Sequence, residues 1–170
     1  VFSVCFAPGD GSRLASGGED GRAKVWEVAT GAVQAELEHG GGGVRSVCFA
    51  PGDGSRLASG GQDGRVKVWE VATGAVQAEL EHGGGSVYSV CFAPGDGSRL
   101  ASGGRDGRVK VWEVATGAVQ AELEHGGGRV RSVCFSPGDG ARLASGGRDG
   151  RVTVWAVATG AVPAPSRRHI

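Results

Sequence analysis

Four cysteines and three histidine-glycine segments are the residues of this chain whose types and spacing suggest chemistry. The cysteines are Cys5, Cys48, Cys91 and Cys134, and they recur once every 43 residues. Zinc sites and disulfide frameworks use close or paired cysteines, and a separation of 43 residues supplies neither. We therefore expect four small core residues that bind no metal and form no disulfide. Unpaired cysteines are typical of a reducing compartment, which favours a cytoplasmic location.

The histidine-glycine segments are the second candidate for chemistry. The letters HGGG begin at His39, His82 and His125. The same letters occur in the oxyanion hole of lipases and esterases, but the G-x-S-x-G segment that carries their nucleophile is absent from this chain. Histidines on separate repeats lie too far apart to share one metal ion through bonds of about 2 Å. We therefore expect solvated or capping histidines, no catalysis and no cofactor.

The elements that position these residues follow a strict repeat. Trp26, Trp69, Trp112 and Trp155 are separated by 43 residues, as are Phe6, Phe49, Phe92 and Phe135. A period of 20 to 50 residues indicates a solenoid, a propeller or another array. The copies 44–86 and 87–129 differ only at Arg45/Tyr88, Gln62/Arg105 and Ser86/Arg129.

Within one copy the apolar residues alternate with a period of two, which predicts strands and not helices. The segments VRSVCF (44–49), RLASG (56–60), RVKVWEV (65–71) and AVQAEL (75–80) are separated by PGDG, QDG, ATG and HGGG. Asp-Gly and similar pairs suit tight hairpin turns. In the last of these strands Val76, Ala78 and Leu80 should face the core. The prediction is an all-β fold: four four-stranded antiparallel meanders stacked as the blades of a β-propeller.

The copies divide the chain into blades at 1–43, 44–86, 87–129 and 130–165, followed by a tail at 166–170. Pro163 and Pro165 interrupt the last strand of the fourth copy, which proline tolerates only at a sheet edge. The chain starts inside a repeat, at Val1, so we expect its natural N-terminus to lie in sequence not given. Four blades leave the flat sides of the first and last exposed. We therefore expect an incomplete ring, closed by additional blades or by two chains that form an eight-bladed assembly.

The charge balance makes some partners less favourable. Lysine plus arginine equals aspartate plus glutamate at 18 each, so the net charge is zero. A balanced charge disfavours nucleic acid and membrane surfaces as partners. No run of eighteen apolar residues is present to span a membrane.

The repeated pattern SVCFAPGDGSRLASGG.DGRVKVWE, followed by a Thr-Gly turn and a fourth strand, resembles the WD-repeat β-propeller family over the chain to about Val162. This resemblance implies a buried polar tetrad in each blade: a tryptophan, a serine, an aspartate and a histidine. Its first three members would be Trp26/Ser16/Asp20, Trp69/Ser59/Asp63, Trp112/Ser102/Asp106 and Trp155/Ser145/Asp149.

The histidine departs from the family pattern. The family has Gly-His before the first strand, whereas this chain has His39-Gly40, His82-Gly83 and His125-Gly126. Two alternatives are open: the loop slips by one residue, or the aspartates use other donors such as backbone N–H groups or water. The family's Trp-Asp is here Trp-Glu (Glu27, Glu70, Glu113), with Ala156 in the last copy.

Almost all of the variation between the copies maps to one end of the predicted blades. Turns alternate between the two ends of an antiparallel meander, so the turn between strands two and three shares an end with the connection into the next blade. We call this the variable end; its candidate binding residues are Phe2, Glu19, Arg45, Gln62, Ser86, Tyr88, Arg105, Arg129, Arg131 and Arg148.

These residues suggest a non-catalytic scaffold that binds a protein or peptide. Aromatic and arginine side chains are enriched at interface hot spots. The variable end becomes more basic toward the last copies, which favours an acidic or phosphorylated segment as the partner. The alternatives are a structural or designed array with no dedicated partner, and a nucleic-acid-binding module.

Overall fold

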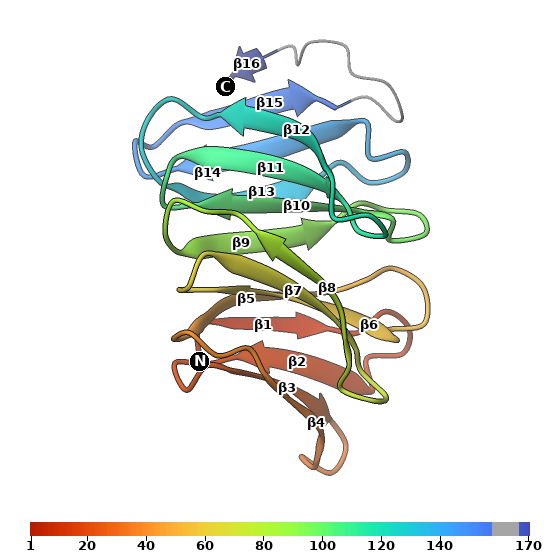
Figure 1. Cartoon of the computed structure of the whole chain (residues 1–170). Coiled ribbons are helices and arrows are strands. Elements are labelled where there is room, and N and C mark those ends of the chain that lie inside the picture. The colour runs from red at the N-terminus through yellow and green to blue at the C-terminus, as the bar shows by residue number, and fades with distance from the viewer. Residues whose placement is uncertain (158–166) are drawn as a thin grey trace.

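The computed structural model describes residues 1–157 and 167–170 of the 170-residue chain, and this part contains strands and no helix (Figure 1). No helix in the described part is therefore long and apolar enough to cross a membrane. The strand bounds, in chain order, are β1 Ser3–Phe6, β2 Arg13–Gly17, β3 Arg22–Glu27, β4 Val33–Glu38, β5 Val44–Phe49, β6 Arg56–Gly61, β7 Arg65–Glu70, β8 Val76–Glu81, β9 Val87–Phe92, β10 Arg99–Gly104, β11 Arg108–Glu113, β12 Val119–Glu124, β13 Val130–Phe135, β14 Arg142–Gly147, β15 Val152–Ala156 and β16 Arg167–His169.

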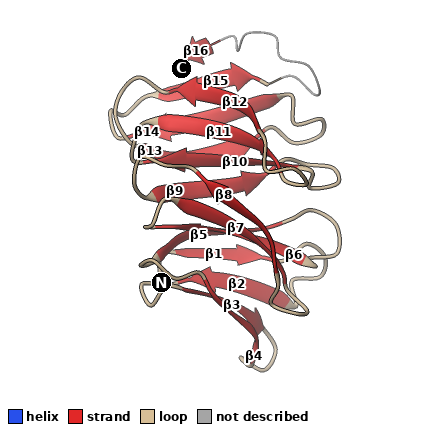
Figure 2. Ribbon diagram, viewed as in Figure 1, coloured by secondary structure: helices blue, strands red, loops and turns tan. Residues whose placement is uncertain are grey.

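The strands form four antiparallel sheets, each a meander of four consecutive strands (Figure 2). The strands pair in the orders β1-β2-β3-β4, β5-β6-β7-β8, β9-β10-β11-β12 and β13-β14-β15-β16. The Asp-Gly turns close the central hairpins: Gly64 has φ +81°, a value that favours glycine. The predicted all-β fold of four-stranded blades is confirmed.

The sheets stack face to face, and their first strands β1, β5, β9 and β13 lie side by side along the stack. Figure 1 shows the sheet that contains β1 and the sheet that contains β15 at opposite ends of the stack. The stack is therefore open, as expected for an incomplete ring.

The hydrophobic core lies between successive sheets and has the same composition at each boundary. Between the first two sheets, Ala15 and Val25 pack against Val47, Phe49 and Trp69. The boundaries between the second and third sheets and between the third and fourth sheets repeat this arrangement. One face of each sheet is thus complementary to the opposite face of the next.

The outermost strands are less regular than predicted. In β8 Leu80 is buried and Ala78 is half-buried, but Val76 is exposed. The pairing of β7 with β8 shifts register between Val68 and Trp69, which turns the start of β8 away from the core.

The fourth sheet also differs from the expectation. Pro163 and Pro165, which were predicted to interrupt its last strand, lie outside the described residues. The segment Arg167–His169, assigned above to a tail, instead pairs with β15 as strand β16. The outermost strand of this sheet therefore lies within the segment assigned to the tail.

Candidate functional site

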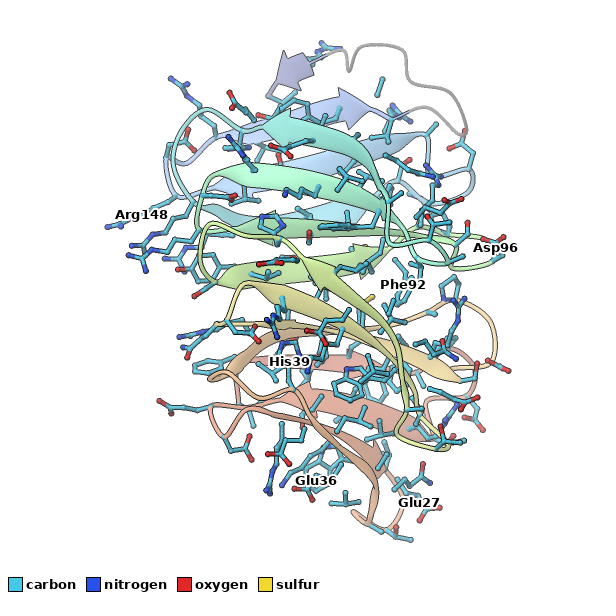
Figure 3. The ribbon with its side chains drawn as sticks, viewed as in Figure 1. Glu27, Glu36, His39, Phe92, Asp96 and Arg148 are labelled. Atoms are coloured by element: carbon cyan, nitrogen blue, oxygen red, sulfur yellow. The ribbon has the colours of Figure 1, made fainter. Side chains whose placement is uncertain are left out.

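The variable end is built where the turn between strands two and three meets the connection into the same sheet. Backbone hydrogen bonds join Gln62 N–H to Gly43 O, Arg105 N–H to Ser86 O and Arg148 N–H to Arg129 O, at 2.9 to 3.0 Å. The fold therefore brings together candidate residues that are about 20 positions apart in the sequence. Figure 3 shows Arg148 projecting from this end of the blades, on the left, with Asp96 at the other end of the blades, on the right.

Three of the candidate residues are the extra residues of β-bulges. In β5, Val44 pairs with Gly61 and Ser46 with Gly60, so Arg45 has no partner in the ladder. Tyr88 in β9 and Arg131 in β13 are bypassed in the same way. A bulge redirects its side chain, and bulges recur beside functional sites.

Stacked side chains connect adjacent sheets at this end. The Arg45 guanidinium lies 4.0 Å from the centre of the Phe2 ring, and the Arg131 guanidinium lies 4.7 Å from the centre of the Tyr88 ring. Both distances are within the range of cation–π attraction. The Nε atom of Arg45 is buried without a hydrogen-bond partner. Stacking holds these arginines in place without neutralising their charge.

The third and fourth sheets carry a group of arginines that lack acidic partners. Arg105, Arg131 and Arg148 are exposed and Arg129 is half-buried. Within the described part of the chain, none of the four forms an ion pair. Arginines on the third strands, by contrast, are paired with glutamates at 2.6 to 2.9 Å: Arg22 with Glu36, Arg65 with Glu79 and Arg108 with Glu122. The first sheet contributes Glu19, so the variable end becomes more basic along the stack.

Two other candidate residues bond within the framework. The Gln62 side chain accepts a hydrogen bond from Gly43 N–H at 3.0 Å, and the Ser86 hydroxyl donates to the Gln62 carbonyl at 3.4 Å. These bonds connect the turn of the second sheet to neighbouring loops. Gln62 and Ser86 therefore shape the surface in addition to lining it.

A buried polar tetrad lies next to the turns of the variable end, and its geometry is clearest in the third sheet. The Trp112 indole N–H donates to Ser102 Oγ at 2.8 Å, and His82 Nδ1 lies 2.8 Å from the same oxygen. His82 Nε2 lies 3.2 Å from Asp106 Oδ1. Asp106 also accepts the backbone N–H of Arg108 at 3.1 Å, which closes the Asp-Gly turn.

The direction of these hydrogen bonds follows from which groups can donate a proton and which can only accept one. A carboxylate only accepts, so His82 Nε2 must carry the proton that bonds Asp106. In the neutral ring Nδ1 then accepts from the Ser102 hydroxyl, whose oxygen accepts from Trp112. Burial lowers the pKa of His82, and the attraction of Asp106 offsets part of this shift. A lowered pKa keeps the imidazole neutral, as this arrangement requires.

The histidines come from the preceding sheet. His39 follows β4 of the first sheet, but it bonds Ser59 at 2.7 Å and Asp63 at 3.3 Å in the second sheet, where Trp69 donates to Ser59 at 2.8 Å. His125 lies 2.9 Å from Ser145 in the fourth sheet and 3.5 Å from Asp149. All three histidines are buried, so the expectation of solvated or capping histidines was wrong. Two alternatives were left open for the aspartates. Replacement of the histidine by other donors is excluded, because Asp63, Asp106 and Asp149 each lie beside a histidine.

The first sheet has only part of this arrangement. Trp26 donates to Ser16 at 2.8 Å, and no histidine precedes them in the sequence. The Asp20 side chain is 52% exposed, whereas that of Asp106 is 17% exposed. The fixed spacing from His39 to Ser59, repeated from His82 to Ser102, is the sequence signal that could have identified the histidine's true partner.

The cysteines lie in a row because the first strands of successive sheets are neighbours. The thiols of Cys5, Cys48 and Cys91 each donate to the carbonyl of the following phenylalanine at 3.4 Å. Interaction with the Cys48 side chain lowers the pKa of Cys5 to about 6 and that of Cys91 to about 7, and the same interactions raise the pKa of Cys48. Cys5, Cys48 and Cys91 are half-buried and pack against the hydrophobic clusters, whereas Cys134 is exposed, so the expectation of four buried core residues was wrong. The described residues contain no group of three or more potential metal ligands.

The comparisons with known proteins agree with this geometry. The family model described as "WD domain, G-beta repeat" matches residues 1–27, 31–70, 74–113 and 117–156. The chain belongs to the WD40 repeat family. Its structure is similar to the crystal structure of the computationally designed Ika4 protein, with a TM-score of 0.79 and 27% identity over 92% of this chain and 91% of that one. No curated protein matches this WD40 chain.

Proposed function

We propose that this WD40 chain is a non-catalytic scaffold that binds an acidic or phosphorylated peptide segment at its variable end. WD40 repeats generally serve as platforms for protein–protein interaction, which supports the general class of function. The observation that carries the finer proposal is the group Arg105, Arg129, Arg131 and Arg148, which lacks acidic partners within the described chain. Unpaired arginines offer planar, bidentate donors to carboxylates and phosphates.

The bulge residues support the same proposal. Arg131 is stacked on Tyr88, so its guanidinium is held near one orientation before a ligand arrives. Such preorganisation lowers the entropic cost of binding. Phe2, Arg45 and Tyr88 add apolar and aromatic area beside the arginines, as at many interface hot spots.

The test compares three fluorescent peptides of one length: a glutamate-rich peptide, a phosphoserine peptide and the neutral serine peptide. We expect the acidic forms to bind and the neutral form not to bind, as measured by fluorescence polarisation. Replacing the four arginines by alanine should weaken binding about 100-fold, which corresponds to two charge-assisted hydrogen bonds of about 1.5 kcal/mol each.

The matched control replaces three arginines that are paired with glutamates, Arg22, Arg65 and Arg108, by alanine. Both variants should retain the circular dichroism of the parent chain, because the changed side chains lie at the surface. Equal loss of binding in both variants would show a general charge effect and refute the site. Preference for a short single-stranded DNA over the acidic peptides would favour the nucleic-acid alternative.

A structural array without a dedicated partner is the second candidate. The near identity of the copies 44–86 and 87–129, and the similarity to a designed protein, favour it. It predicts that none of the peptides binds. We also propose that additional blades or self-association close the ring, because both end sheets leave apolar side chains uncovered.

A further inference from the structure

We propose that the exposed face of the first sheet binds the exposed face of the fourth sheet in a second copy of this chain, so that two chains close one ring. This inference specifies the self-association proposed above and does not depend on peptide binding. The two faces lie at opposite ends of the stack and do not meet within one chain (Figure 1).

The first sheet presents one half of the interface that recurs inside the stack. Phe6 is 61% exposed and Val4 is 63% exposed. Their equivalents in the other three sheets, for example Phe135 and Val133, are at most 6% exposed because each packs against the preceding sheet. Val28 is exposed in the same way. These side chains form an apolar face in the position where every other sheet has a neighbour.

The fourth sheet presents the other half, with a cavity in place of the missing phenylalanine. Its open face holds a cavity of about 220 Å³ lined by residues that include Cys134, Arg142, Ala144 and Val154. In the third sheet the equivalent residues are Cys91, Arg99, Ala101 and Val111; three of them share a hydrophobic cluster with Phe135, and the Arg99 guanidinium lies 5.6 Å from its ring centre. The cavity on the fourth sheet therefore matches Phe6 of a second copy.

A glycine on the same face shows how closely the backbone fits its neighbour. A Cβ built on Gly103 would lie 2.5 Å from Val130 Cγ1 and 2.9 Å from Val133 Cγ1 across the third boundary. The equivalent residue in the fourth sheet, Gly146, has nothing within 4 Å of that position. The space at Gly146 is the space that a valine of the next sheet occupies elsewhere.

Polar contacts repeat across each internal boundary and have unused equivalents at the two ends. The Ser89 hydroxyl accepts the Val133 N–H at 3.1 Å, and Arg56 donates to the Asp96 carbonyl at 2.6 Å. In the fourth sheet the groups equivalent to Ser89 and Arg56 are the exposed Ser132 and Arg142. In the first sheet the groups equivalent to the Val133 N–H and the Asp96 carbonyl are the Val4 N–H and the Asp10 carbonyl. The interface between two copies would therefore satisfy polar groups in the same manner as the boundaries inside the chain.

This interface is heterologous, because a different face is used on each copy. Heterologous contacts form rings when the rotation closes and filaments when it does not. Two copies joined through both pairs of faces contain eight sheets and no open face. The same faces would meet additional blades in a longer chain, and that arrangement would leave the 170-residue chain monomeric.

The experiment measures mass by light scattering during size exclusion of the 170-residue chain. We expect about 34 kDa, twice the 17.1 kDa of one chain. Phe6→Glu places a charge in the interface, and Gly146→Leu fills the space that the second copy needs. Both residues face open space in the single chain, so each variant should remain folded and elute as a monomer, with dimerisation at least about 100-fold weaker.

The companion variant Gly103→Leu makes the same change at an internal boundary and should destabilise the chain itself, which circular dichroism on heating would detect. A parent chain that is monomeric at all concentrations would overturn the proposal. So would a series of masses above 34 kDa, or a dimer that persists in both Phe6→Glu and Gly146→Leu. Phe6 lies at the other end of β1 from the variable end, so the loss of the dimer in Phe6→Glu does not bear on peptide binding. Gly146 lies two residues before Arg148, so peptide binding is compared between the parent and Phe6→Glu alone.

Discussion

The polar tetrad allows a comparison within one chain, because the same serine occurs with and without a histidine partner. Ser102 accepts from Trp112 at 2.8 Å and bonds His82 at 2.8 Å, and it is fully buried. Ser16 accepts only from Trp26, at 2.8 Å, whose ring is half-buried. We predict that Ser102→Ala lowers the free energy of unfolding much more than Ser16→Ala does.

The magnitude follows from the groups that each variant leaves without partners. Ser102→Ala leaves an indole N–H and an imidazole nitrogen unsatisfied in a buried site, at about 1–3 kcal/mol each, so about 4 kcal/mol in total. Ser16→Ala removes one hydrogen bond that water can replace, at about 1 kcal/mol. The expected difference is therefore about 3 kcal/mol.

The assay is urea unfolding at one protein concentration, followed by circular dichroism and tryptophan fluorescence. The first sheet is terminal and the third is internal, so their sensitivity to any change can differ. Ala15→Gly and Ala101→Gly calibrate this difference, since both alanines are fully buried at the position just before the serine. After this calibration, equal losses for Ser16→Ala and Ser102→Ala would refute the contribution of His82.

Two other predictions concern protonation. Burial holds the pKa of His82 below its ordinary value of 6.5, so the unfolded chain binds more protons than the folded one. The free energy of unfolding should therefore be highest above pH 6.5 and should fall as the pH drops below that value. Urea midpoints at pH 7.5, 6.0 and 5.0 would test this, and His82→Gln should show a smaller dependence on pH. Interaction with the Cys48 side chain lowers the pKa of Cys5 to about 6, whereas burial raises that of Cys134. Iodoacetamide at pH 7 should therefore alkylate Cys5 faster than the more exposed Cys134, measured by mass spectrometry in the monomeric Gly146→Leu chain. Cys48→Ala should slow the reaction of Cys5, and a faster reaction of Cys134 would contradict the pKa order.

Much of the fold could be predicted from the sequence because the period of 43 residues and the alternation within it are both local signals. The segment 44–49 became β5 with the predicted bounds, and the Asp63-Gly64 pair forms the tight turn that its composition suggested. The bulges at Arg45, Tyr88 and Arg131 could not be predicted. A bulge depends on the register between two strands, and the sequence of one strand does not specify that register.

The contacts of the histidines and cysteines were missed for a different reason. His39 lies next to the connection between two sheets, and its position was judged by the order of histidine and glycine, whereas the signal is the constant spacing from each histidine to the serine of the next sheet. The cysteines are 43 residues apart in the sequence, which argued against any pairing. In the fold the first strands of successive sheets are neighbours, so residues one period apart, such as Cys5 and Cys48, come into contact. In a stacked repeat, one full period of separation is therefore a prediction of proximity.

The limits of the matched repeats explain why the tetrad crosses from one sheet to the next. The segment 31–70 includes β4 of the first sheet and β5 to β7 of the second, and it contains His39, Ser59, Asp63 and Trp69 together. If each repeat is taken to start at a first strand, as in the blades 44–86 and 87–129, the histidine falls in one repeat and its serine, aspartate and tryptophan partners fall in the next. Within a matched segment such as 31–70, all four members of the tetrad belong to one repeat. The tetrad connects the last strand of one sheet to the middle strands of the next. Because arrays of this kind gain much of their stability at such junctions, loss of one tetrad should weaken the contact between two sheets more than either sheet alone.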